Sequence, residues 1–124
     1  MLVIFNHTKL NADQIEALNK ININKITYLP DELSLKWSNI DPEKEIIDLS
    51  EFKEFIINNT DVDEIVLIQG DFGAAFQLVN FCLERDRIPV YATTRRTAEE
   101  KMNPDGSVEK ISKFKFVKFR KYLK

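Results

Sequence analysis

The fold class is decided by the stretch Glu64-Ile65-Val66-Leu67-Ile68, which continues into Gln69-Gly70-Asp71-Phe72-Gly73 and an apolar segment ending at Leu83. The first five residues are typical of a strand buried on both faces of a parallel sheet. The two glycines indicate a tight turn. Residues 74–83 predict a helix that is apolar nearly all round and therefore covered on both sides.

The segments on either side of this unit alternate between strand-like and helix-like patterns. Strands are predicted at Leu2–Phe5, Lys25–Leu29 and Ile88–Ala92. Helices are predicted after the capping residues Asn11 and Asp48, with a helical turn at 31–37. Strands separated by helices are typical of right-handed crossovers and a parallel sheet.

A β-hairpin is predicted at the end of the chain. Asn103-Pro104-Asp105-Gly106 is a turn sequence between two strand-like segments, at 97–102 and 107–119. The alternation of apolar and polar residues slips between Phe116 and Val117, which indicates a bulge. The expected fold is one α/β domain over residues 1–124, with a Rossmann-like, mostly parallel sheet and a C-terminal β-hairpin.

The composition excludes several classes of protein. Hydrophobic residues make up 44% and charged residues 31% of the 124, which is typical of a globular domain. No apolar run approaches the ~20 residues that a membrane span needs, and the start lacks the pattern of a signal peptide. Cys82 and His7 are the sole cysteine and histidine, so we expect a cytoplasmic protein without a disulfide, metal site or cofactor.

Charge is distributed unevenly along the chain. The net charge of −2 predicts no duplex nucleic-acid partner, but residues 110–124 carry +7 and residues 1–109 carry −9. Seven basic residues and no acid make this terminal segment a local attractor for phosphates. The equally weighted alternative is an edge strand that lysines protect against aggregation.

Polar residues follow each predicted strand, where ligands of open α/β sheets bind. These groups are Asn6-His7, Trp37-Ser38-Asn39, Gln69–Gly73 and Thr93-Thr94-Arg95-Arg96. A helix that starts after glycines presents free N–H groups to an anion, and arginine forks fit phosphate oxygens. Together the residues predict a phosphate site, whereas each motif alone is explained by a turn, a helix cap or solvated charge.

Several of these residues have two interpretations. His7 could transfer protons near neutral pH or serve as a hydrogen-bonded structural residue. Asp71 could act as a base, although an Asp just before a helix is more often its cap. Trp37 could stack on a base or belong to the core.

Six segments, in order and at compatible spacings, resemble the CRISPR-associated accessory family numbered twenty in the Csx series. The segments are Phe5-Asn6-His7-Thr8, Tyr28-Leu29-Pro30 with Trp37-Ser38-Asn39-Ile40, Gln69–Ala74, Pro89–Thr94, Asp105–Val108 and Phe119-Arg120. That family is similar to small standalone CARF domains, which are Rossmann-like sensors of cyclic oligoadenylates.

The resemblance implies a CARF-like ring nuclease that cleaves cyclic oligoadenylate, chiefly cyclic tetra-adenylate, and switches off type III CRISPR signalling. It also implies a homodimer, and a metal-independent route through the 2′-hydroxyl of the ligand. The catalytic candidates are His7, Arg95, Arg96 and Asp71. The ligand-binding candidates are the other strand-end residues: Asn6, Trp37, Ser38, Asn39, Gln69, Gly70, Phe72, Gly73, Thr93 and Thr94.

Two other functions stay open at this point. One is a protein that senses or sequesters the cyclic nucleotide without cutting it. The other is an adaptor that binds RNA or a protein through the basic hairpin, which predicts a salt-sensitive contact.

Overall fold

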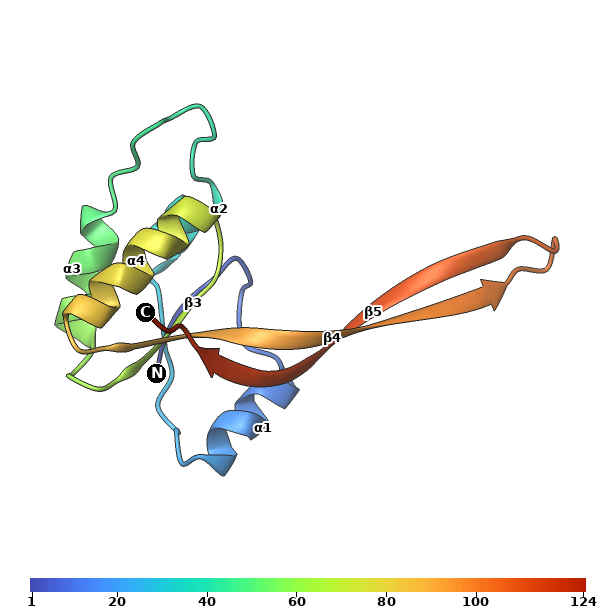
Figure 1. Ribbon diagram of the computed structural model, residues 1–124, viewed down its shortest axis with the longest axis horizontal. Coiled ribbons are helices and arrows are strands. Elements are labelled where there is room, and N and C mark those ends of the chain that lie inside the picture. Colours follow the sequence, from blue (N-terminus) through green and yellow to red (C-terminus); the bar gives the residue numbers. More distant parts are fainter.

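The computed structural model describes residues 1–124 as a five-stranded mixed sheet with helices on both faces (Figure 1). The strand order is β2-β1-β3-β4-β5. The first three pairings are parallel and the pairing of β4 with β5 is antiparallel. The elements are β1 Leu2–Ile4, α1 Ala12–Lys20, β2 Thr27–Tyr28, α2 Asp31–Ser38, α3 Ser50–Asn59, β3 Ile65–Ile68, α4 Phe72–Glu84, β4 Ile88–Met102 and β5 Val108–Lys121.

The predicted α/β class, the parallel core and the terminal antiparallel hairpin are confirmed. β1 lies between β2 and β3. The chain adds β2 on one side of β1, and it later adds β3, β4 and β5 in turn on the other side. α1 covers one face of the sheet, and α2, α3 and α4 cover the opposite face (Figure 1). No helix has the length and apolar character that crossing a membrane requires.

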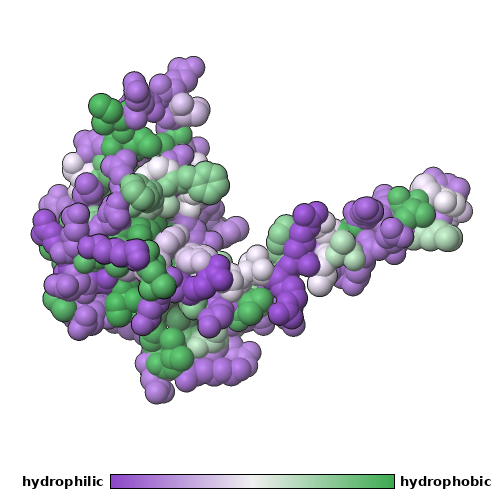
Figure 2. Space-filling model, viewed as in Figure 1, coloured by the Kyte–Doolittle hydropathy of each residue, from purple (hydrophilic) through white to green (hydrophobic).

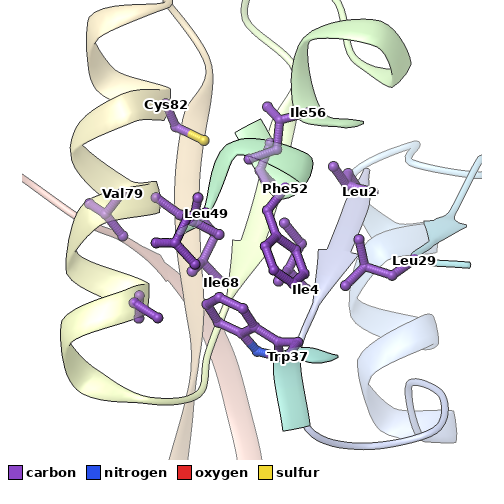
Figure 3. Close-up of a cluster of buried hydrophobic side chains, with 14 residues drawn as sticks. Leu2, Ile4, Leu29, Trp37, Leu49, Phe52, Ile56, Ile68, Val79 and Cys82 are labelled. Carbon is purple, nitrogen blue, oxygen red and sulfur yellow. The ribbon is translucent and has the colours of Figure 1, made fainter. Parts of the chain in front are cut away.

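The strands divide the hydrophobic core into two clusters, because successive side chains of a strand point to opposite faces. The larger cluster joins alternate residues of β1 and β3 to α2, α3 and α4, and includes Trp37, Phe52 and Cys82 (Figure 3). The smaller one joins Val3, Leu67 and the α1 side of the sheet. At the carboxyl ends of β1 and β3, Ile4 and Ile68 are fully buried, so the core extends to this end of the sheet.

One of the two predicted helix caps is present in the structure and the other is not. Asn11 forms the predicted capping box with Gln14, through hydrogen bonds of 2.9 Å in each direction. Asp48 was expected to cap the next helix, and this is wrong because α3 begins at Ser50 with Leu49 in the cap position. The Asp48 carboxylate instead accepts hydrogen bonds from the backbone N–H and hydroxyl of Ser50.

The predicted end of the fourth strand at Thr93–Arg96 is wrong. β4 is 15 residues long and extends to Met102, because β5 pairs with it in antiparallel orientation from Val90 onward. The ladder skips one residue opposite Thr93 and Thr94, which leaves Val117 unpaired and confirms the predicted bulge. The outer half of this ribbon, residues 95–115, projects from the body and is called the arm (Figure 1).

Candidate functional site

Three hollows surround the carboxyl ends of β1 and β3, where the sequence predicted a site. The first, about 410 Å³, lies beside α2 and is lined by residues that include Asn6, His7 and Ser38. The second, about 370 Å³, lies between α4 and the β4–β5 pair; we call it the aromatic hollow, and its residues include Phe72, Phe76, Tyr91 and Tyr122. The third, about 260 Å³, we call the arm hollow; its residues include His7, Lys9, Gln69, Thr94, Phe114 and Phe116.

The arm hollow brings basic and polar side chains together with two aromatic rings of the ribbon. The loop after β1 contributes His7 and Lys9, and the ribbon contributes Thr94 with the rings of Phe114 and Phe116. His7 is exposed and touches the edge of the Phe5 ring, with centroids 5.4 Å apart. Its imidazole makes no hydrogen bond or ion pair within the chain, so both ring nitrogens are available to a ligand.

Gln69 forms the floor shared by the aromatic hollow and the arm hollow. Its backbone N–H donates to Ile4 O at 2.9 Å, which extends the pairing of β3 with β1. Its side-chain Oε1 accepts from the Ala92 N–H at 3.0 Å, which extends the link to β4. The side-chain NH₂ group is left free to donate to a ligand.

Trp37 lies beneath this floor and is a core residue, which confirms one of its two interpretations and leaves no face of the indole open for stacking on a ligand. Its side chain is 1% exposed, and Nε1 donates to the backbone oxygen of Gln69 at 2.9 Å. The indole also explains Gly70, because a Cβ there would lie 2.6 Å from Nε1. Gly70 therefore provides room for Trp37, and close approach of a ligand is not needed to explain it.

Arg95 and Arg96, both predicted to contact phosphate, do not lie on the same side of the ribbon. They are neighbours in a strand, so their side chains point to opposite faces of the ribbon. Arg96 shares a face with Thr94; its guanidinium lies 6.0 Å from the Phe114 ring centre and donates to the Ser112 hydroxyl at 3.1 Å. Arg95 shares the other face with Lys115. One arginine, Arg96, is thus placed beside the arm hollow.

The start of α4 has a side-chain cap and is exposed to solvent. The Asp71 carboxylate accepts from the Ala74 N–H at 3.0 Å, as expected of a helix cap, so its role as a base is not supported. Gly73 is exposed, and a Cβ there would meet the Asp71 carboxylate at an ordinary 3.6 Å. Phe72 projects into solvent with 94% of its side chain exposed. The predicted cover on both sides of α4 is therefore incomplete.

The remaining candidates are scattered. Asn39 donates from its side chain to Leu35 O at 2.8 Å and lies in a groove between α2 and α3, away from the three hollows. The Thr93 hydroxyl donates to Lys118 O at 3.1 Å on the face opposite the arm hollow. Asn6 and Ser38 reach only the hollow beside α2.

Apart from Phe72, sequence reasoning missed the aromatic residues that line two of the hollows. Tyr91 and Tyr122 pack with ring centres 4.7 Å apart, and the Tyr122 hydroxyl donates to Ile68 O at 2.7 Å. Burial raises the pKa of Tyr122, which keeps this donor protonated. The alternation from Phe114 to Phe116 was the available signal, since it marks one apolar face of a strand that extends past the body.

Comparison with known proteins identifies relatives across the whole chain. A family model described as the Uncharacterized protein MJ1673 family matches residues 1–120. The Uncharacterized protein MJ1673 of Methanocaldococcus jannaschii is 43% identical over 125 residues, which cover 98% of this chain and 95% of that protein. No solved structure matches the chain.

Proposed function

The chain belongs to the MJ1673 family. We propose, from the geometry of its site, that it binds cyclic oligoadenylate in the arm hollow and cleaves it. One observation carries the proposal. The hollow places an unpaired histidine and a lysine, His7 and Lys9, opposite the phenyl rings of Phe114 and Phe116. Rings offer stacking surfaces to adenines, the cation attracts phosphates, and the imidazole suits proton transfer near neutral pH.

The proposed reaction is an attack of a ribose 2′-hydroxyl on the adjacent phosphorus, without a metal ion. The 2′-oxygen forms a bond to phosphorus as the bond to the 5′-oxygen breaks, which gives a 2′,3′-cyclic phosphate and a 5′-hydroxyl. His7 removes the 2′ proton or delivers a proton to the leaving oxygen. Lys9 and Arg96 stabilise the charge that builds on the phosphate oxygens. Thr94 and the Gln69 amide hold the ligand.

The ligand class comes from the resemblance to the CRISPR-associated family numbered twenty in the Csx series. On that basis we assign the fold to the Rossmann-like CARF type, the preferred ligand to cyclic tetra-adenylate and the location to the cytoplasm. We also propose a homodimer, since a ring with two-fold symmetry can be met by the same strand-end surface from two copies.

The decisive test is to incubate the purified protein with cyclic tetra-adenylate in EDTA and resolve the products. We expect linear products that end in 2′,3′-cyclic phosphate. Activity that appears only after a divalent metal ion is added would refute the metal-free route. Intact ligand after long incubation with excess protein would refute cleavage altogether.

A second function, sequestration of the cyclic nucleotide without cleavage, is favoured by one feature of His7. Catalytic bases are usually oriented by a third group, whereas no carboxylate or carbonyl of this chain holds the His7 ring. Tight binding of the intact ring with no products in the same experiment identifies this function.

A further inference from the structure

The ribbon of β4 and β5 has a cationic face that the proposed function does not use. Directly paired residues of an antiparallel ladder share a face, so the register places five cations together on the side opposite the arm hollow: Arg95, Lys113, Lys115, Lys118 and Arg120. All five are exposed. Lys113 makes the one ion pair of the group, to Glu99 at 3.6 Å. Figure 2 shows hydrophilic side chains along the projecting ribbon.

This positive charge stands apart from an acidic body. Residues 88–124 contain ten basic and four acidic side chains, a net charge of +6, whereas residues 1–87 contain eight basic and sixteen acidic ones, a net charge of −8. The outer part of the β4–β5 ribbon projects from the body (Figure 1), so the cations on it stand away from these acids. A polyanion can therefore approach the cationic face from solvent with little repulsion from the body.

The row of cations ends at the aromatic hollow. Arg120 is paired with Tyr91, lies with its guanidinium 4.9 Å from that ring centre and donates to its hydroxyl. Beyond Tyr91 the hollow is walled by Tyr122 and by the exposed rings of Phe72 and Phe76. Stacking surfaces thus lie directly beside the innermost cation.

We propose that the cationic face and the aromatic hollow together bind single-stranded RNA. Cations alternate along β5 with a separation of about 7 Å for every second residue, a spacing comparable to that of successive phosphates in an extended strand. Proteins that bind single strands combine such a cationic track with aromatic rings on which bases stack. The alternative partner, an acidic protein surface, could pair with the cations of this face, but it would not account for the open aromatic hollow beside them.

The test measures fluorescence anisotropy of labelled 12-nucleotide oligoadenylate and oligouridylate between 50 and 200 mM salt. The variant K113Q/K115Q/K118Q removes three charges from the cationic face. Its matched control K20Q/K44Q/K110Q removes two exposed lysines of the body and one, Lys110, on the opposite face of the ribbon. A second pair compares Phe76→Ala in the aromatic hollow with Ile46→Ala, an exposed residue far from it.

We expect both RNAs to bind the wild-type protein. The cationic-face variant should weaken binding at least tenfold and reduce the slope of log K against log salt by about 2, since each phosphate contact contributes about 0.7 for single strands. Phe76→Ala should weaken it several-fold, and both controls should stay within twofold. Cleavage of cyclic tetra-adenylate should be unchanged in every variant, because His7 lies on the other face.

Three results would overturn the proposal. One is no RNA binding by wild-type protein at 50 mM salt. Another is an equal loss in the K20Q/K44Q/K110Q control, which would mean attraction by net charge alone. The third is sedimentation showing that K113Q/K115Q/K118Q converts a dimer to a monomer while RNA binding is unchanged, which would assign the face to a second copy of the chain.

Discussion

Replacing Trp37 with phenylalanine tests whether the indole supports the floor of the site. The change removes the donor to the backbone oxygen of Gln69, and an unsatisfied, largely buried acceptor costs about 1–3 kcal/mol. The phenyl ring is smaller by on the order of 40 Å³, and a cavity of that size adds about 1 kcal/mol. The free energy of unfolding should therefore fall by about 2–4 kcal/mol.

Thermal unfolding followed by circular dichroism measures this loss. A chain of this length unfolds with an entropy of roughly 260 cal/mol/K, so each kcal/mol lowers Tm by about 4 °C, and Trp37→Phe should lower it by roughly 8–15 °C. Phe76→Leu is the control, because its exposed ring should leave Tm within about 2 °C. A decrease below 3 °C for Trp37→Phe would refute the supporting role.

A double-mutant cycle with Gly70→Ala makes the test specific to the contact between the two residues. The added methyl group would lie 2.6 Å from Trp37 Nε1, so the single Gly70→Ala variant should lose about 1–3 kcal/mol through overpacking. Phenylalanine lacks that nitrogen, so Gly70→Ala should cost less in the Trp37→Phe background. Additive losses would show that Gly70 is required for another reason.

Four further predictions concern the candidate site and the core. His7→Ala should lower the single-turnover rate of cyclic tetra-adenylate cleavage by roughly 10²–10⁴ with little change in affinity, and a wild-type rate would refute proton transfer by His7. Arg96→Ala should weaken ligand binding roughly tenfold or more in a titration, whereas Arg95→Ala should not, because the two point to opposite faces. Asp71→Ala should cost about 1 kcal/mol in urea unfolding, as loss of a cap does, and leave the rate unchanged. Burial raises the pKa of Cys82 from 9.0 to about 12. The stability that the neutral thiol contributes should therefore be complete below pH 9 and decline as the pH rises toward 12. Iodoacetamide at pH 8 should label Cys82 only in denaturant.

The sequence was sufficient for the parallel core because its signals are local. A continuous apolar run such as Ile65–Ile68 indicates a doubly buried strand, and the Asn11 capping box fixes a helix start within four residues. The length of β4 was not predictable in this way. The continuation of Thr93–Arg96 depends on pairing with residues of β5 that are 18 to 25 positions distant in sequence.

The sequence predicted a site at the carboxyl ends of the strands, where the structure has three hollows, but the structure groups the candidate residues differently. Adjacency in sequence suggested that Arg95 and Arg96 act together, whereas adjacency in a strand separates them onto opposite faces. Trp37 was ambiguous because exposure of an aromatic residue depends on tertiary packing. The arm hollow was missed as a unit because its two walls, His7 and Phe114, come from opposite ends of the chain.

The floor of the site at Gln69 is held by more hydrogen bonds than its walls, and this difference affects how a ligand is bound. Its backbone oxygen, backbone N–H and side-chain oxygen bind Trp37, Ile4 and Ala92, so three elements fix the floor of the site before any ligand arrives. The walls are built differently, because His7 makes no hydrogen bond and Arg96 bonds only to Ser112 within its own ribbon. Affinity and selectivity are therefore expected to reside in the walls, and stability in the floor. Substitutions in the floor and in the walls should therefore have different effects. Changes beneath Gln69 should mainly lower Tm, whereas changes at His7 or Arg96 should alter the rate or the affinity while Tm stays nearly constant.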